Sequence, residues 1–197
     1  MTTDNRAEHT PSASSLSNNS IAFIALCNEY CAALEHAAEA TSRREFVAEM
    51  LRLLPRIYIS ATDLAGASID AEPLYIEPAV DEDYYEAVRR AIETLMGPDD
   101  TYLEVFEEDM KYSDTPIAAS IAEGMADLFQ VFYNMLEMAR EAPTEFIAEI
   151  LVAVKEDFEQ YWSRILCNLL RALNHVRYNR SFGSDDDDEG YSPAGDY

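Results

Sequence analysis

Apolar residues recur at helical spacing through most of the chain, and this periodicity is the strongest constraint on its fold. Each apolar stripe ends at a turn signal, and no run approaches the roughly 18 apolar residues that span a bilayer. The sequence therefore predicts an all-α fold: an irregular bundle of five or six helices with a long C-terminal helix. The predicted helical segments are residues 20–40, 42–64, 81–96, 115–142 and 143–178.

Residues with strong positional preferences mark the ends of these helices. The predicted helix starts are Ser42, Asp81, Thr115–Pro116 and Pro143. Gly97, followed by a proline, predicts a stop, and Pro55 predicts a kink inside the second helix. Gly124 lies within a helix, where glycine is unfavourable, which indicates a close helix crossing. Residues 101–111 favour a short helix, although the start of this segment could also pair as a strand.

The composition divides the chain into one domain and two ends. Residues 1–19 are rich in Ser, Thr and Asn, and we expect a disordered arm there, because little apolar surface is available for burial. Residues 20–180 form a single predicted helical domain, since a chain of 197 residues that is 48% hydrophobic can bury one sizeable core. Residues 181–197 form a predicted disordered acidic tail.

The chain is strongly acidic, with 14 basic and 38 acidic residues and a net charge of -24. This charge repels phosphate backbones and anionic lipid heads, so neither nucleic acid nor a membrane surface is an expected partner. The charge is uneven, because residues 70–115 carry 15 acids and 3 bases, whereas residues 165–180 carry three arginines and no acid. No secretory signal follows the first residues, and the chain has three cysteines, which together predict a cytoplasmic protein with free thiols.

Most catalytic and metal motifs are missing from the sequence. Cys27 and Cys31 lie one helical turn apart but lack the usual spacing of zinc ligands, so buried thiols are expected. No Glu-x-x-His pair supports a di-iron site, and no glycine-rich phosphate loop is present. We therefore assign no catalytic residue, cofactor-binding residue or cofactor.

One set of carboxylates keeps a metal site open as an alternative. Glu104 and Glu107 match the first half of the magnesium motif of helical nucleotide pyrophosphohydrolases, but the second half, Glu-x-x-Asp, is missing. Solvated surface carboxylates are the commoner explanation of such a pattern. The alternative metal ligands are Glu104, Glu107, Glu123 and Asp127.

Polar residues follow one face of each of the last two predicted helices. The first stripe consists of Glu123, Asp127, Gln130 and Asn134, and the second of Arg164, Asn168, Arg171 and His175. Each is interpreted first as a solvated face. The cationic end is also a candidate interaction surface for the acidic tail or an acidic partner, through Arg164, Arg171, His175 and Arg177.

Five short segments resemble a bacterial family of small, acidic, all-helical proteins of unknown function that is familiar from gut anaerobes. These segments are residues 27–31, 53–58, 99–102, 109–113 and 121–127, and the likeness covers about residues 20–178. The resemblance implies a helical bundle in a bacterial cytoplasm, and it implies no activity or cofactor.

Two functions remain as hypotheses. The first is a non-enzymatic interaction protein whose acidic surface binds a basic partner protein, because complementary charge steers association. The second is a divalent-metal-dependent hydrolase that uses carboxylates of residues 99–127. The partner, any small-molecule ligand and the oligomeric state are left open by the sequence.

Overall fold

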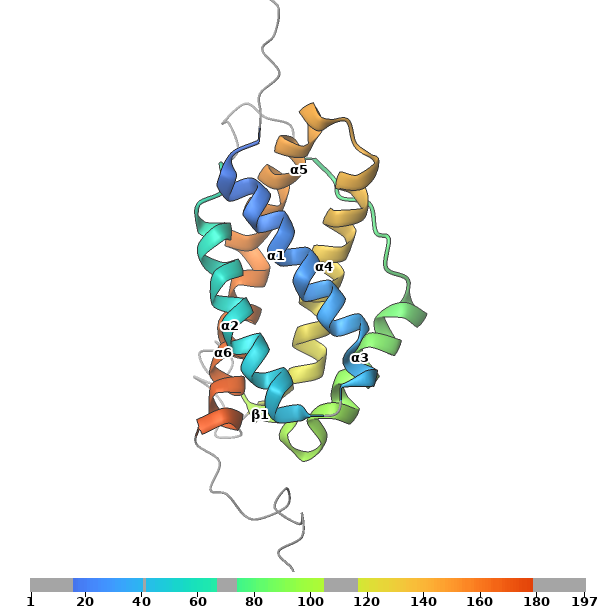
Figure 1. The fold of residues 1–197 in the computed structure, drawn as a ribbon, viewed down its shortest axis with the longest axis vertical. Helices are drawn as coiled ribbons and strands as arrows, with labels where there is room; N and C mark the ends of the chain where they lie inside the picture. Colours follow the sequence, from blue (N-terminus) through green and yellow to red (C-terminus); the bar gives the residue numbers. More distant parts are fainter. Residues whose placement is uncertain (1–15, 41, 67–73, 105–116, 179–197) are drawn as a thin grey trace, which may run out of the picture.

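The computed structural model describes residues 16–40, 42–66, 74–104 and 117–178, and most of these lie in helices (Figure 1). Residues 1–15 of the predicted arm and the whole of the predicted tail, residues 181–197, lie outside these ranges. The elements in chain order are α1 (Asn18–Glu35), η1 (Ala37–Glu39), α2 (Arg43–Thr62), α3 (Glu82–Met96), η2 (Gly97–Asp99), β1 (Thr101–Leu103), β2 (Ala118–Ser120), α4 (Ile121–Glu141), α5 (Thr144–Asp157), η4 (Phe158–Trp162) and α6 (Ser163–Tyr178).

Helix α4 occupies the centre of the bundle. It packs against α1, α3, α5 and α6, while α2 closes the bundle by packing against α1 and α6. Figure 1 shows α4 behind α1, with α2 and α6 on one side and α3 on the other. The predicted all-α bundle is thus confirmed.

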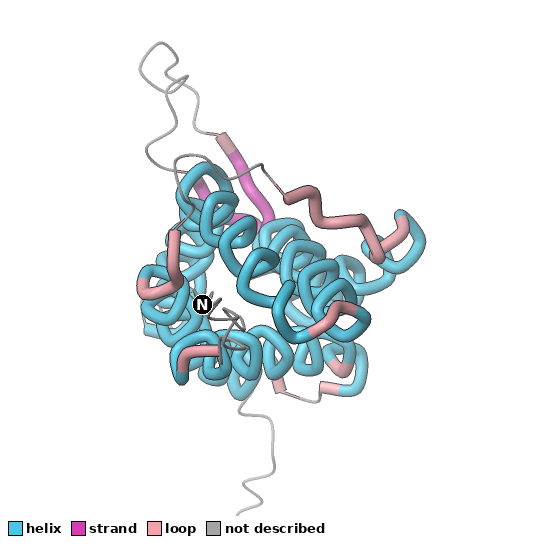
Figure 2. The backbone as a smooth tube through the Cα atoms, turned by 90° about the horizontal axis from the view of Figure 1, so that it is seen from above, coloured by secondary structure: helices cyan, strands magenta, loops and turns pink. Residues whose placement is uncertain are grey.

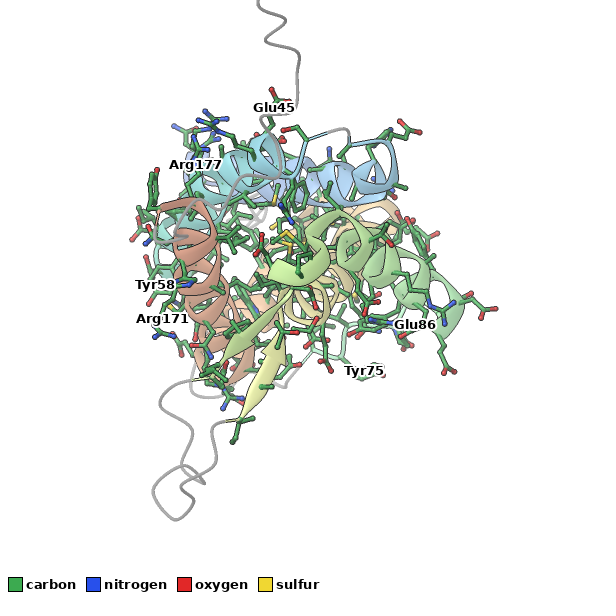
Figure 3. The ribbon with its side chains drawn as sticks, turned by 90° about the horizontal axis from the view of Figure 1, so that it is seen from below. Glu45, Tyr58, Tyr75, Glu86, Arg171 and Arg177 are labelled. Carbon is green, nitrogen blue, oxygen red and sulfur yellow. The ribbon has the colours of Figure 1, made fainter. Side chains whose placement is uncertain are left out.

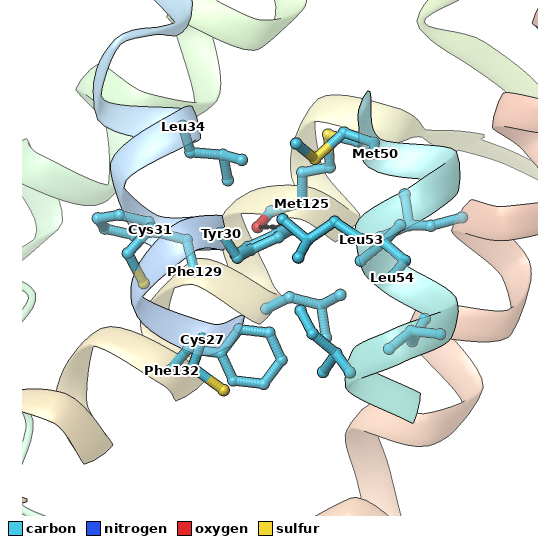
Figure 4. Packing of buried hydrophobic residues seen from close by; sticks show 14 of the residues in the cluster. Cys27, Tyr30, Cys31, Leu34, Met50, Leu53, Leu54, Met125, Phe129 and Phe132 are labelled. Atoms are coloured by element: carbon cyan, nitrogen blue, oxygen red, sulfur yellow. Dashed lines mark hydrogen bonds between the residues drawn. The ribbon is translucent and has the colours of Figure 1, made fainter. Parts of the chain in front are cut away.

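An aromatic cluster joins the first and last helices through α4. The ring of Phe132 meets those of Phe23, Tyr30 and Trp162 at centroid distances of 6.4, 5.3 and 5.1 Å. The hydroxyl of Tyr30, which is fully buried, donates a hydrogen bond of 2.9 Å to the backbone oxygen of Met125 (Figure 4). A buried phenol needs such a partner, so this contact fixes α1 against α4 as well as filling the core.

The sequence predicted several helix ends correctly. The side chain of Ser42 accepts a hydrogen bond from the backbone of Glu45, and Asp81 caps α3 by accepting one from Tyr84. Gly97 ends α3 with a φ of 55°, a conformation that favours glycine. Helix α2 continues through Pro55.

The segment before α4 differs from the prediction. Thr101–Leu103 forms a strand rather than a helix and pairs antiparallel with Ala118–Ser120 (Figure 2). Helix α4 therefore begins at Ile121, with Ser120 as its N-cap, and not at Pro116. Capping explains why the helix starts later than predicted. The Ser120 side chain accepts a hydrogen bond from the Glu123 N–H, and residues 118–120 are held in the strand pair instead of a helix. The rest of the ambiguous segment, residues 105–116, lies outside the described residues.

The predicted long C-terminal helix runs from Thr144 to Tyr178 with a five-residue π-helical turn, Phe158–Trp162, inside it. Such turns insert an extra residue into the helical period. Trp162 is fully buried here, and its indole N–H donates to the backbone oxygen of Val154. An extra residue shifts the positions that follow it around the helix axis, which is consistent with apolar side chains that lie off the main stripe in this half of the helix.

Asp100 anchors the strand pair to the start of α4. It is 7% exposed, and its Oδ1 accepts a hydrogen bond of 2.8 Å from the backbone N–H of Ala122. Its backbone oxygen accepts another of 2.8 Å from Ile121. One residue therefore compensates two donors in the first turn of the central helix.

Asp100→Ala should lower the free energy of unfolding by about 1–3 kcal/mol, because it leaves a buried backbone donor without a partner. Urea unfolding followed by circular dichroism measures this change. Asp100→Asn keeps an acceptor oxygen and is the matched control. Equal stability of the two variants would contradict the assigned anchoring role.

Gly124 provides a close crossing between α4 and α6, as the sequence predicted. A Cβ at this position would lie 3.2 Å from Cδ2 of Leu169 and 3.5 Å from Cγ2 of Ile165. Gly124→Val should therefore destabilise the protein by about 1–3 kcal/mol through overpacking. Gly66→Val is the control, since no atom lies within 4 Å of a Cβ there. In urea unfolding, Gly124→Val should have a lower free energy of unfolding than Gly66→Val.

Candidate functional site

A small cleft lies where β1, β2, α4 and α6 meet, and we call it the carboxylate cleft. Its volume is about 140 Å³, and its lining consists of Tyr102, Glu104, Ala119, Ser120, Glu123, Gly124, Asp127, Arg164, Ile165 and Asn168. Part of each polar stripe predicted on separate helices, Glu123 and Asp127 on one and Arg164 and Asn168 on the other, thus lines this cleft. Three of the described lining residues are acids and one is a base.

The strand pair places Glu104 at the cleft. Tyr102 pairs with Ala119, and beyond the strand the N–H of Glu104 donates a hydrogen bond of 2.8 Å to the backbone oxygen of Ile117. The side chain of Glu104 is 9% exposed, and its Oε1 accepts a hydrogen bond from Asn168 of α6. A carboxylate brought inside the protein in this way is uncommon and requires compensation.

Helix α4 contributes the other two acids from successive turns. Glu123 is exposed, and Asp127 is half-buried. The Oδ1 atom of Asp127 accepts a hydrogen bond of 2.8 Å from the hydroxyl of Tyr85 on α3. Burial raises the pKa of Asp127 above its ordinary value of 3.8, and the bond from Tyr85 opposes this rise.

Three tyrosines respond to this concentration of negative charge. The pKa values of Tyr85, Tyr102 and Tyr161 are raised, in each case chiefly by burial and then by neighbouring carboxylates. Asp127 acts on Tyr85 and Tyr161, while Glu104 acts on Tyr102. The phenols therefore stay protonated and serve the site as hydrogen-bond donors.

The structure divides the predicted site residues into groups. Glu104, Glu123 and Asp127 line one cleft, whereas Glu107 lies outside the described residues. Among the described residues, no group of three or more His, Cys, Asp or Glu side chains is arranged to hold a metal ion.

The predicted cationic surface is divided as well. Arg164 lines the cleft, and Arg171 is near enough to Tyr102 to act on its hydroxyl electrostatically. His175 is exposed and Arg177 half-exposed further along α6, outside the cleft lining. Figure 3 shows Arg171 and Arg177 on the side of the molecule opposite Glu86 and Tyr75.

Tyr102 and Ser120 were not identified from the sequence. Both belong to the strand pair, whose paired residues lie 15 to 19 positions apart in the sequence, with a segment outside the described ranges between them. The available signal was the strand-like pattern at Tyr102 and Leu103. The polar stripe of α4 has a structural part too, because Oδ1 of Asn134 accepts backbone N–H groups of Ala79 and Val80.

A second, larger cleft of about 780 Å³ lies between η1, the start of α2 and α3. Arg43, Arg44 and Arg90 line it together with mostly small residues, and no acid is among the described residues of this lining. Arg43 has a structural role, since it donates to the backbone oxygen of Met96 and pairs with Asp99 at 3.2 Å. Arg90 pairs with Glu86. These pairings reduce the cationic character of this cleft.

The thiols do not form a reactive site. Cys27 and Cys31 are buried as expected, whereas Cys167 is exposed. Burial raises the pKa of all three thiols, most strongly those of Cys27 and Cys31. A raised thiol pKa suppresses the nucleophilic thiolate.

Fold and site together define an all-α bundle with an acid-lined cleft between its central and last helices. The model of a family described as domain of unknown function DUF5063 matches residues 14–179, and the chain belongs to this family. The solved structure of protein BF1032 from Bacteroides fragilis is similar, with 29% identity and a TM-score of 0.70 over 83% of this chain and 95% of that one. No curated protein matches the chain. None of the described helices is both long and apolar enough to cross a membrane.

Asp127→Asn should raise the melting temperature at neutral pH. Because the folded-state pKa of Asp127 is raised, folding disfavours its ionised form, and stability falls as pH increases through that pKa. The gain should shrink when the pH falls below the ordinary carboxyl pKa of 3.8, where the wild-type side chain is protonated. Melting curves at neutral and strongly acidic pH measure both effects.

Glu149→Gln is the control for this prediction, since it makes the same charge change at an exposed position of α5. It should alter the melting temperature less than Asp127→Asn at neutral pH. If both variants raised the melting temperature equally, the effect would come from the change in net charge, which would contradict a cause in the surroundings of Asp127.

Proposed function

We propose that the protein is a non-enzymatic bacterial interaction protein of the cytoplasm, whose acidic surface binds a basic partner protein. The observation that carries this proposal is the carboxylate cleft, whose described lining brings together Glu104, Glu123 and Asp127 with one cation, Arg164. A cleft in which one sign of charge is in excess concentrates and orients ligands of the opposite sign.

The size of the cleft supports binding of a side chain rather than catalysis on a whole substrate. Its volume of about 140 Å³ is below the roughly 300–1,000 Å³ typical of small-molecule sites. Its described lining contains no histidine or cysteine, the side chains that most often act as base or nucleophile near neutral pH. The end of one long cationic side chain fits this volume and charge better than a whole substrate does.

The surface around the start of α3 supports a protein partner. Glu77, Glu82 and Asp83 are exposed there, and Tyr75 is 68% exposed. Exposed aromatic side chains beside charge are frequent anchors of protein interfaces. With a net charge of -24, the whole molecule attracts basic proteins and repels acidic ones.

The second candidate function is a divalent-metal-dependent hydrolase. The convergence of Glu104, Glu123 and Asp127 in one cleft favours it, because magnesium is often held by only a few carboxylates. Against it, the described residues contain no group arranged to hold a metal. The interaction protein is therefore the preferred function.

Charge reversal in the cleft tests the preferred function. The immobilised full chain should retain basic proteins from a bacterial lysate at low salt, and Glu123→Lys should lose them. Glu149→Lys on α5 carries the same change of net charge and should retain them. A retained protein is then purified, and its binary affinity for the three forms is measured by calorimetry. Equal affinity for both variants would contradict the proposal.

Thermal melting with millimolar magnesium or manganese tests the alternative. The interaction function predicts an unchanged melting temperature. An increase that Glu104→Ala or Glu123→Ala abolishes would instead favour the hydrolase.

A further inference from the structure

The larger cleft, between η1, the start of α2 and α3, combines positive charge with an apolar lining, and we call it the arginine cleft. Its described lining contains Arg43, Arg44 and Arg90, and most of the other described lining residues are alanines. Its volume of about 780 Å³ is sufficient for several side chains. An excess of one charge in such a concave surface attracts the opposite charge, so this cleft favours an acidic occupant.

The guanidinium groups of the arginine cleft keep hydrogen-bond donors available. Arg44 is exposed and has no hydrogen bond or ion pair with another described residue. Arg43 pairs through Nη1 with Asp99. Arg90 pairs through Nε with Glu86. Because a guanidinium carries five N–H donors, each of these pairs leaves donors for a further carboxylate.

The sequence supplies an acidic segment close to this cleft. Residues 185–197 contain six acids, two tyrosines and no base, and they follow α6 in the chain. Helices α2 and α6 pack side by side with opposite chain directions, so the end of α6 lies near the start of α2 (Figure 1). Figure 3 shows Arg177, near the end of α6, and Glu45, in the first turn of α2, on the same side of the molecule.

The chain is long enough to bring these acids into the arginine cleft. Asp185 follows Tyr178, the last residue of α6, by seven residues, and Glu189 follows it by eleven. An extended chain of this length spans roughly 23–40 Å, whereas neighbouring helices lie about 8–10 Å apart. Helix α6 contacts α2, whose first residues line the cleft. The acidic run therefore has the reach to enter it.

We propose that the arginine cleft binds the acidic segment, residues 185–197, of its own chain. A net charge of -24 repels free anions from the molecule, whereas a short tether concentrates an attached one. Single ion pairs at a surface contribute little, so binding depends on several acids together. The tyrosines of the segment add cation–π contacts with arginine.

This contact does not depend on the proposed function, because both partners belong to one chain. It has a consequence for that function, since the acids of a bound segment pair with the arginine cleft. They are thereby removed from the acidic surface that a basic partner protein meets.

The test is paramagnetic relaxation in the ¹⁵N-labelled full chain. A nitroxide is attached at Ser192→Cys in a Cys167→Ser background. Cys27 and Cys31 resist labelling, because both are buried and burial raises their thiol pKa values. At low salt the nitroxide should broaden amides of residues 37–40, 42–44 and 87–95. In 1 M salt, where the Debye length is about 3 Å, this broadening should fall about twofold or more.

Variants identify the groups that make the contact. Arg44→Glu should reduce the broadening about twofold or more, because it replaces an attraction by a repulsion. Arg52→Glu makes the same charge change at an exposed position of α2 outside the described lining, and it should leave the broadening unchanged. Replacing the five acids of residues 185–189 by their amides should remove the broadening without changing the length of the segment.

Several results would overturn the proposal. These are no broadening at the arginine cleft, broadening that resists both high salt and Arg44→Glu, or an equal loss with Arg52→Glu. Broadening confined to the amides around Arg171 and Arg177 would place the segment on α6 instead. If circular dichroism shows that Arg44→Glu is unfolded, the variant with amides at residues 185–189 decides between the outcomes.

A mixing experiment separates a contact within one chain from a contact between chains. The ¹⁵N-labelled chain without nitroxide is mixed with an equal amount of unlabelled chain that carries it. The proposal predicts no broadening at the arginine cleft in this sample. Broadening as strong as in the single labelled chain would identify a second copy as the source and overturn the proposal.

Discussion

The structure depends on the burial of α4 among four other helices. One side of this helix contributes large apolar side chains to the core, including Phe129 and Phe132, which are fully buried. The remaining side carries Glu123, Asp127 and Asn134, and these polar groups need partners wherever neighbouring elements cover them. Tyr85 serves Asp127, and the backbone of residues 79–80 serves Asn134. The carboxylate cleft opens toward α6 on the part of this polar side that is not covered.

The strand pair gives the cleft its unusual carboxylate. Asp100 fixes β1 to the first turn of α4, and three residues of strand then bring Glu104 to face Asn168 of α6. A helix in place of β1 would have directed this side chain elsewhere, because side chains alternate along a strand but rotate around a helix. The local choice of a strand over a helix at residues 101–103 thus determines the chemistry of the site.

Particular elements show how far sequence reasoning extends. Ser42, Asp81 and Gly97 predicted helix ends because their local chemistry sets the backbone, and Gly124 predicted a close crossing because glycine alone removes the Cβ. The strand pair was not resolved, since pairing between residues 101–103 and 118–120 depends on tertiary contacts rather than local preference.

For the candidate site too, local sequence patterns predicted individual residues, whereas their arrangement depends on tertiary contacts. Glu104, Glu123, Asp127 and Arg164 were identified as two sets on separate segments. Their convergence depends on the packing of α4 against α6 and on the strand pair, and neither is encoded by local spacing. Tyr102 joined the site for the same reason. The stripes of polar residues were interpreted first as solvated faces, whereas the structure places part of each stripe in a shared cleft.

The most direct test of the carboxylate cleft as a binding site is a crystal structure of the full chain with a basic protein that it retains. The account predicts a lysine or arginine nitrogen of that protein in the carboxylate cleft, about 2.7–2.9 Å from a carboxylate oxygen of Glu123 or Asp127. A cleft that holds a metal ion, or a protein bound away from α4 and α6, would contradict it.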